Sequence, residues 1–337
     1  MNIKLNDSKI KPIGRYAYDG DSLKGECTGA GFEFHADLKS DVIVKCKFVN
    51  YAEVEDVHIG VMVDNNYDDM KNFLVPLDAT EFTALSGVTG EHIVKIVKLN
   101  EFNRNGVCFD SIEFDGELLD RPADKPLKFE FYGDSLTCGY GNLHPNRNHP
   151  SPFNNYEHGY RTYASLLCNH FNAEMTVAAA SGYGIFKDCE GTDRIWADFY
   201  DKALPKEGVE WNFDNYKADA VFINLGSNDW NFTQNHDATV STDDMFANAK
   251  KIIDDIRAKN PDCKLIFNYG INDYPLKNQK IDIPSLYERL NETYKNSYVV
   301  KELQCNQLGG DWHPNVNDHY TAFSKFLCRL KDLKVEF

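Results

Sequence analysis

The first third of the chain alternates hydrophobic and polar residues in short runs that turn residues separate. Alternation with a period of two predicts strands with one buried face, and almost no helical period interrupts these runs. The runs are residues 31–38, 41–49, 57–65, 92–99 and 107–116. We therefore expect an antiparallel all-β sandwich over residues 1–122.

The pattern changes after a segment at residues 118–126, which has two prolines and several charges and is typical of a linker. Beyond it, apolar runs with strand character alternate with helical periods. Strands are expected at residues 127–132, 174–179, 220–225 and 264–268, and helices at 160–171, 242–259 and 320–330. This alternation predicts an α/β domain with a parallel sheet over residues 127–337. Active sites in such sheets lie beyond the carboxyl ends of the strands.

Composition narrows the classes of partner. The net charge of −16 argues against nucleic acid or an anionic membrane surface, and leaves neutral sugars open. No run approaches the ~20 apolar residues of a membrane span, and the first residues do not resemble a signal peptide. A cytoplasmic location is therefore expected, with secretion as the alternative if a leader has been removed from the sequence. Nine cysteines without a C-x-x-C pair favour reduced thiols over disulfides or a zinc site. The oligomeric state is left open.

Polar blocks follow the predicted strands. They are Gly133-Asp134-Ser135, Ser181-Gly182-Tyr183-Gly184, Gly226-Ser227-Asn228-Asp229 and, before the last helix, Asp311-Trp312-His313-Pro314. Each block alone has an ordinary interpretation as a turn, a helix cap or a surface histidine. Their coincidence at one edge of the sheet, in this order, favours a catalytic centre.

Acyl transfer needs a nucleophile, a base and donors for the developing oxyanion. Ser135 supplies a hydroxyl, and His313 is a base that titrates near neutral pH. The main-chain N–H groups of Ser135 and Gly182 and the side-chain amide of Asn228 are the candidate oxyanion donors.

The set Ser135, Gly182, Asn228 and His313 resembles that of the SGNH (GDSL-like) hydrolase superfamily. With a β-rich half ahead of it, the sequence resembles carbohydrate esterase family 2. The resemblance implies a jelly-roll sandwich followed by a three-layer SGNH domain. It also implies removal of O-acetyl groups from polysaccharides such as xylan and mannan by a serine nucleophile, without a cofactor.

The block around His313 departs from the common SGNH pattern, which has an aspartate three residues before the histidine. Position 310 is glycine, and the nearest acid is Asp311. The resemblance leaves two ways to orient His313: the Asp311 carboxylate as the third catalytic group, or a main-chain carbonyl of this loop. We favour the carbonyl.

Tyr183, Trp230 and Trp312 lie beside these blocks, and flat rings suit the apolar face of a sugar. Core packing is the alternative for each. The long connection of residues 139–159 is a wall of the cleft or a surface flap. Its histidines lack the carboxylate or cysteine spacing of a metal site, so we expect no metal.

We therefore expect a carbohydrate O-acetyl esterase that acts on acetylated oligo- or polysaccharides. One alternative is an SGNH lipase, arylesterase or thioesterase, although the polar 139–159 connection does not resemble an apolar lid. A non-catalytic carbohydrate-binding protein is the other alternative.

Overall fold

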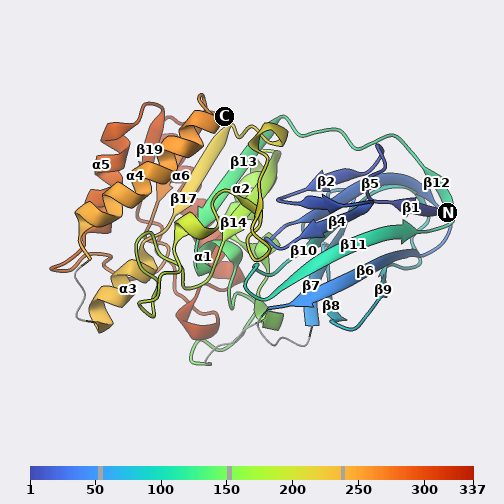
Figure 1. Cartoon of the computed structure of the whole chain (residues 1–337), viewed down its shortest axis with the longest axis horizontal. Coiled ribbons are helices and arrows are strands. Elements are labelled where there is room, and N and C mark those ends of the chain that lie inside the picture. Colours follow the sequence, from blue (N-terminus) through green and yellow to red (C-terminus); the bar gives the residue numbers. More distant parts are fainter. Residues whose placement is uncertain (52–55, 150–153, 237–239) are drawn as a thin grey trace.

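The computed structural model describes residues 1–51, 56–149, 154–236 and 240–337. Figure 1 shows two parts side by side, a β-sandwich drawn in blue to cyan and an α/β part drawn in green to red. Leu118 of the expected linker is the last residue of strand β12 (Gly116–Leu118), and the other residues, 119–126, join it to strand β13 (Leu127–Gly133).

The N-terminal part consists of two antiparallel sheets. The first has the order β3-β4-β11-β6-β9, with β1 on β11, and the second has the order β12-β5-β10-β7-β8, with β2 on β5. The strands are β1 Asn2–Lys4, β2 Lys11–Ile13, β3 Ala17–Asp19, β4 Ser22–Gly25, β5 Gly31–Leu38, β6 Val42–Asn50, β7 Asp56–Val63, β8 Lys71–Pro76, β9 Glu81–Leu85, β10 Gly90–Lys98, β11 Asn105–Glu113 and β12 Gly116–Leu118.

The core of the sandwich comes from the inward positions of the alternating runs. Phe32 and Phe34, two residues apart on β5, are both fully buried, and the ring of Phe109 from the opposite sheet meets Phe32 edge-on at 5.2 Å. Two facing sheets thus bury one apolar layer between them, as the period of two predicts.

The C-terminal part is built on a five-stranded parallel sheet with the order β14-β13-β17-β18-β19. Its strands are β13 Leu127–Gly133, β14 Ala173–Ala179, β17 Ala220–Asn224, β18 Lys264–Asn268 and β19 Ser297–Val300. The chain order reverses between β13 and β17. This switch point is where ligands bind in doubly wound sheets.

Helices cover both faces of this sheet. They are α1 Ser135–Cys138, α2 Tyr163–His170, α3 Ser227–Asn235, α4 Thr242–Lys259, α5 Ile283–Thr293 and α6 Val316–Asp332, with a small hairpin of β15 Lys202–Leu204 and β16 Val209–Glu210. Helix α2 starts later than expected because Gly159–Arg161 forms a 3₁₀ turn and Thr162 caps the helix. Ser241 caps α4, as its position before the helical period predicts.

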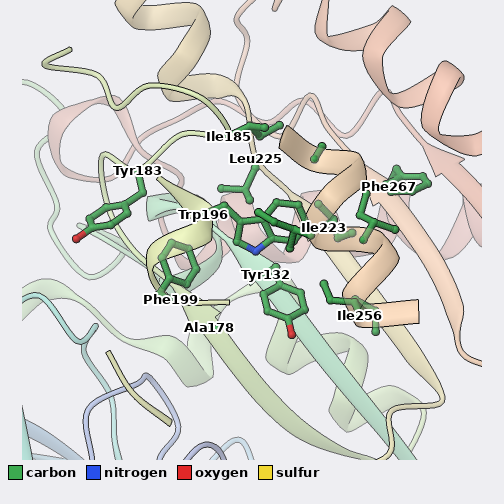
Figure 2. Close-up of a cluster of buried hydrophobic side chains, with 14 of the residues drawn as sticks. Tyr132, Ala178, Tyr183, Ile185, Trp196, Phe199, Ile223, Leu225, Ile256 and Phe267 are labelled. Carbon is green, nitrogen blue, oxygen red and sulfur yellow. The ribbon is translucent and has the colours of Figure 1, made fainter. Parts of the chain in front are cut away.

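The two faces of the sheet have separate apolar cores. Buried residues of α2 and α6 pack on one face, and those of α4 and α5 pack on the other. Figure 2 shows the second core, where Trp196 and Phe199 from the segment after β14 lie beside Tyr132. Tyr183 lies at the margin of this cluster, and its hydroxyl points away from it.

Buried ion pairs join the two parts of the chain. The Arg15 guanidinium from the sandwich lies 2.8 Å from the Glu130 carboxylate and donates to the Tyr132 hydroxyl at 2.9 Å, both on β13. Arg15 and Glu130 are fully buried. Because removing one partner of such a pair leaves an uncompensated charge, this contact fixes the sandwich against the α/β part.

Neither a membrane span nor a disulfide is present in the part of the chain that the structure describes. None of the helices there is long and apolar enough to cross a bilayer. All nine cysteines are unpaired.

Candidate active site

Ser135 lies where β13 ends and α1 begins, at the switch point of the sheet. The Asp134 side chain caps α1 by accepting a hydrogen bond from the Leu136 N–H at 3.0 Å. Because the first N–H groups of a helix have no acceptor within the helix, the Ser135 N–H can donate to a ligand at the end of the sheet. The local sequence thus presents both the hydroxyl and the N–H of one residue.

Asp134 also joins two of the polar blocks. The Ser227 hydroxyl donates to its second carboxylate oxygen. Burial raises the pKa of Asp134 to about 6. This fully buried side chain therefore ties the end of β13 to the end of β17 and sets the spacing between Ser135 and Asn228.

His313 meets Ser135 across the end of the sheet. The Nε2 atom of His313 lies 2.8 Å from the Ser135 Oγ, and its Nδ1 lies 2.8 Å from the main-chain carbonyl oxygen of Asp311. With Nδ1 donating to that carbonyl, Nε2 is the acceptor for the serine proton. The Asp311 contact is thus made by the main chain, as we favoured; the Asp311 side chain is exposed.

The turn that carries His313 has an unusual backbone. Asp311 and Trp312 both have positive φ angles, 50° and 58°. Their N–H groups donate to the carbonyls of His149 and Arg147, at 3.2 and 3.1 Å. These bonds from the long 139–159 connection hold a conformation that costs a non-glycine residue about 1 kcal/mol or more.

Gly141 supports the same turn. A Cβ atom at this position would lie 2.9 Å from the Gly310 carbonyl oxygen, and the Gly310 N–H donates to the Gly141 carbonyl at 3.0 Å. Gly141 therefore allows the histidine loop to approach the serine. Residues 150–153 of the 139–159 connection lie outside the described residues, so the choice between a cleft wall and a flap stays open for them.

The protonation state of His313 suits a base. Burial lowers its pKa below the ordinary 6.5, and the hydrogen bond to the Asp311 carbonyl opposes this shift. The imidazole is therefore neutral at pH 7 and able to accept a proton from Ser135.

This shift predicts the acid limb of the pH profile. Protonation of His313 removes the base, so kcat/KM for an acetyl ester should stay level from neutral pH downward and fall only through a pKa below 6.5. The measurement is kcat/KM for 4-nitrophenyl acetate against pH. An acid limb centred above 6.5 would contradict this assignment of the base.

The other two oxyanion candidates line the same cleft as Ser135. Gly182 has a φ of +85°, which favours glycine, and it lines the same cleft as Ser135. Asn228 is in the first turn of α3, and its Nδ2 donates to the Tyr183 carbonyl at 2.8 Å. Since an amide nitrogen carries two hydrogens, this bond orients Asn228 and leaves one hydrogen for a ligand.

Asp229 fixes the loop that carries Gly182. Its buried carboxylate accepts hydrogen bonds from the N–H groups of Ile185, Phe186 and Lys187 at 2.8 to 2.9 Å. A helix cap was one interpretation of the block around Asp134, and the Asp134 side chain does cap α1; the sequence did not suggest its bond with Ser227 or the role of Asp229. The positions of Asp134 and Asp229 in the chain, directly beside Ser135 and Asn228, could have indicated that they hold these residues in place.

The cleft around Ser135 has a volume of about 480 Å³ and a largely polar lining. The sandwich contributes Tyr51, Asn103 and Arg104, which sequence reasoning missed because nothing in their pattern marks them. The remaining lining residues are Ser135, Tyr140, Ser181, Gly182, Tyr183, Cys189, Glu190, Arg194, Lys206, Asn228, Asn231, Asp311 and His313.

The three aromatic candidates have different surroundings. Tyr183 lines the cleft. Trp230 is outside the lining and stacks on Tyr274, with ring centroids 5.1 Å apart. Trp312 is also outside it; 46% of Trp312 is exposed, and the Arg147 guanidinium lies 3.7 Å from its ring centroid. The structure thus brings one of the three into the cleft.

One cluster of metal-ligating residue types occurs among the described residues. Glu101, Cys138 and Glu157 offer atoms within 4.8 Å of one another. The Arg104 guanidinium lies 3.0 Å from Glu101 and 3.9 Å from Glu157, and burial raises the pKa of the Cys138 thiol. Arg104 pairs with Glu101, and burial raises the pKa of Glu157 to about 8, so these groups fit an ion-pair network better than a metal site.

Comparisons with known proteins agree with this geometry. Residues 131–316 match the model of the GDSL-like Lipase/Acylhydrolase family. The cellulase/esterase CelE of Acetivibrio thermocellus is 29% identical over 284 residues, which are 80% of this chain and 33% of that protein. The acetylxylan esterase / glucomannan deacetylase of Cellvibrio japonicus is 25% identical over 73% of this chain and 70% of its own.

A solved structure aligns over almost the whole chain. It is a family two carbohydrate esterase from Clostridium thermocellum in complex with cellohexaose, with a TM-score of 0.84, 25% identity and coverage of 96% of this chain and 99% of that one. These likenesses confirm the expected fold class and the resemblance to family 2 esterases. The chain spans about a third of the length of CelE and 70% of the Cellvibrio enzyme.

Proposed function

Because the chain belongs to the GDSL-like Lipase/Acylhydrolase family, we propose that it is a serine esterase that removes O-acetyl groups from acetylated sugars or oligosaccharides. The observation that carries this proposal is the 2.8 Å contact between the Ser135 hydroxyl and the His313 Nε2 within a polar cleft.

Each step of the reaction has a residue for it. His313 Nε2 takes the proton of Ser135 as the Oγ attacks the acetyl carbonyl carbon. The N–H groups of Ser135 and Gly182 and the Asn228 amide donate to the oxyanion. His313 then gives the proton to the departing sugar oxygen, which leaves an acetyl-serine. In the second half, His313 takes a proton from a water molecule whose oxygen attacks the acetyl carbon; the bond from that carbon to Ser135 Oγ then breaks, His313 returns the proton to Oγ, and acetate leaves.

The Asp311 carbonyl serves as the orienting group in this scheme. It holds Nδ1–H, which fixes the tautomer of His313 and stabilises the imidazolium that forms during each proton transfer. The Asp311 carboxylate has no part in the reaction.

The lining of the cleft supports a sugar rather than a lipid. Asn103, Asn228 and Asn231 offer amides that donate to and accept from sugar hydroxyls. The names of the relatives and the cellohexaose bound to the similar esterase point to plant polysaccharides, such as acetylated xylan or mannan. A cytoplasmic location stays a prediction, which nine unpaired thiols suit.

The described lining of the cleft favours neither alternative. A lipase needs an apolar surface for the acyl chain, whereas this cleft is lined largely by polar and charged side chains. A non-catalytic binding protein has no need of an aligned serine–histidine pair with a neutral imidazole.

The acyl group preference separates these functions. Because Ser181, Tyr183 and Cys189 line the cleft next to Gly182, we expect acetyl esters to be preferred over longer ones. Each methylene that a tight pocket excludes is worth ~1–3 kcal/mol. The experiment measures kcat/KM for 4-nitrophenyl acetate, butyrate and octanoate. Equal values for acetate and octanoate would favour a lipase, and no turnover of any ester would favour a binding protein.

A further inference from the structure

The loop between β10 and β11 belongs to the sandwich and contributes Asn103 and Arg104 to the cleft around Ser135. Glu101 lies on this loop and is fully buried. The fully buried Lys98 donates to the carbonyl of Glu101 at 2.9 Å, and the Gly159 N–H donates to the Leu99 carbonyl at 2.9 Å. The main chain around Glu101 is therefore fixed from both parts of the molecule.

The side chain of Glu101 contacts the loop of residues 180–187, which follows β14 and carries Gly182; we call it the oxyanion loop. Its Oε2 accepts a hydrogen bond from the Ser181 N–H at 2.6 Å. Ser181 directly precedes Gly182, so this bond fixes the peptide immediately before the proposed oxyanion donor. The far end of the same loop is held by Asp229, and the Tyr183 carbonyl between them is held by Asn228.

Glu101 is itself held at three points. The Arg104 guanidinium lies 3.0 Å from its other oxygen, its own N–H donates to Glu157 at 2.6 Å, and the Asn103 amide donates to Oε2 at 3.4 Å. A buried carboxylate with a cation on one oxygen and a main-chain N–H on the other makes a strong, directional hydrogen bond. Glu101 is therefore suited to fixing the position of the Ser181 N–H, and not only to filling space in the core.

The loop between β10 and β11 is also linked to His313, through the ring of Tyr140. The Arg104 guanidinium lies 5.6 Å from the Tyr140 ring centroid, and the Tyr140 ring meets the His313 ring edge-on at 4.8 Å. The network that holds Glu101 thus borders both the oxyanion loop and the histidine.

We propose that Glu101 of the β-sandwich is a positioning residue for the oxyanion site of the α/β part. By holding the Ser181 N–H, it directs the Gly182 N–H toward the oxyanion, so the hydrolase centre is complete only with the sandwich in place. This inference rests on the proposed esterase function. It accounts for a fully buried carboxylate that the proposed reaction does not consume.

The test compares Glu101→Ala with a control that removes another buried, ion-paired carboxylate. Glu33→Ala removes another buried carboxylate of the sandwich, one that lies 3.2 Å from Lys95 and 3.6 Å from Lys11 and does not line the cleft. Loss of an oxyanion donor costs ~10²–10³-fold in kcat, so Glu101→Ala should lower kcat for 4-nitrophenyl acetate by about 100-fold at nearly constant KM. Glu33→Ala should lower only the thermal unfolding temperature.

Conservative variants separate placement from charge. Glu101→Gln keeps an oxygen acceptor at the same reach, so it should recover kcat to within about tenfold of the parent. Glu101→Asp keeps the charge but withdraws the oxygen from Ser181, so its kcat should fall further than that of Glu101→Gln. If Glu101→Ala does not fold, this order still decides the question.

A double variant gives a measurement that would not change if Glu101 only stabilised the fold. Glu101→Ala combined with Asn228→Ala should cost less in kcat than the product of the two single effects, because both damage one oxyanion site. The inference is overturned if Glu101→Ala keeps the kcat of the parent, if Glu101→Ala raises only KM, or if the kcat of Glu101→Asp exceeds that of Glu101→Gln. Ser135→Ala is measured in parallel. If it stays active, the proposed function itself fails; if it is inactive while Glu101→Ala is normal, the inference about Glu101 alone fails.

Discussion

Replacing Ser135 with alanine is expected to lower kcat for 4-nitrophenyl acetate by ~10⁴-fold or more, the usual cost of losing a nucleophile. The hydroxyl is the atom that His313 contacts, at 2.8 Å, and alanine offers no substitute for it. The main-chain N–H of residue 135 remains, as do Gly182 and Asn228, so a small residual rate from the oxyanion site is expected.

The Ser135→Ala protein should stay folded. The Asp134 cap and its bond with Ser227 do not involve the Ser135 side chain, so thermal unfolding and circular dichroism should match the parent. Ser324→Ala, on the exposed side of α6 away from the cleft, is the matched control and should keep full activity. More than a tenth of parent turnover in Ser135→Ala would end the assignment of the nucleophile.

His313→Ala and substitutions of Asp311 should differ widely in effect. Loss of the base should cost about as much as loss of the nucleophile, ~10⁴-fold or more in kcat, because the two act as a unit. Asp311 contributes its main-chain carbonyl, which every substitution retains. Asp311→Asn should therefore keep kcat within about tenfold of the parent, far above the ~10⁴-fold loss that an essential orienting carboxylate would give.

The choice of asparagine matters because of the backbone. Asp311 has a φ of 50°, and asparagine tolerates this region better than alanine does. Asp311→Ala is expected to be slightly less active than Asp311→Asn, through strain in the turn rather than loss of charge. If Asp311→Asn falls as far as His313→Ala, the carboxylate is the third member of a triad and the assignment to the carbonyl is wrong.

The sequence predicted the strands and helices that show a clear pattern of buried and exposed positions along their length. The alternation at residues 31–38 marks β5 to the residue, and the apolar run at 220–225 marks β17. Strands such as β1 and β12 have three residues each, too few to show a period. Helix α3, whose sequence is largely polar, has no apolar stripe to reveal it.

The candidate site divides in the same way. Ser135, Gly182, Asn228 and His313 could be predicted because each follows or precedes an element whose end the sheet places at one edge. Glu101 could not, because its hydrogen bond with Ser181 joins residues 80 positions apart in the chain. The sequence also left open what surrounds Trp230, since its stacking on Tyr274 depends on a loop that lies 44 positions further along the chain.

Release of acetate from an acetylated xylo-oligosaccharide, measured for the parent protein with Ser135→Ala as the blank, tests the central claim most directly. The account predicts acetate in proportion to the amount of parent enzyme and none above background from Ser135→Ala. Equal acetate from both proteins would contradict the role of Ser135. Cleavage of 4-nitrophenyl acetate without acetate from acetylated xylan or mannan oligosaccharides would contradict the proposed substrate class.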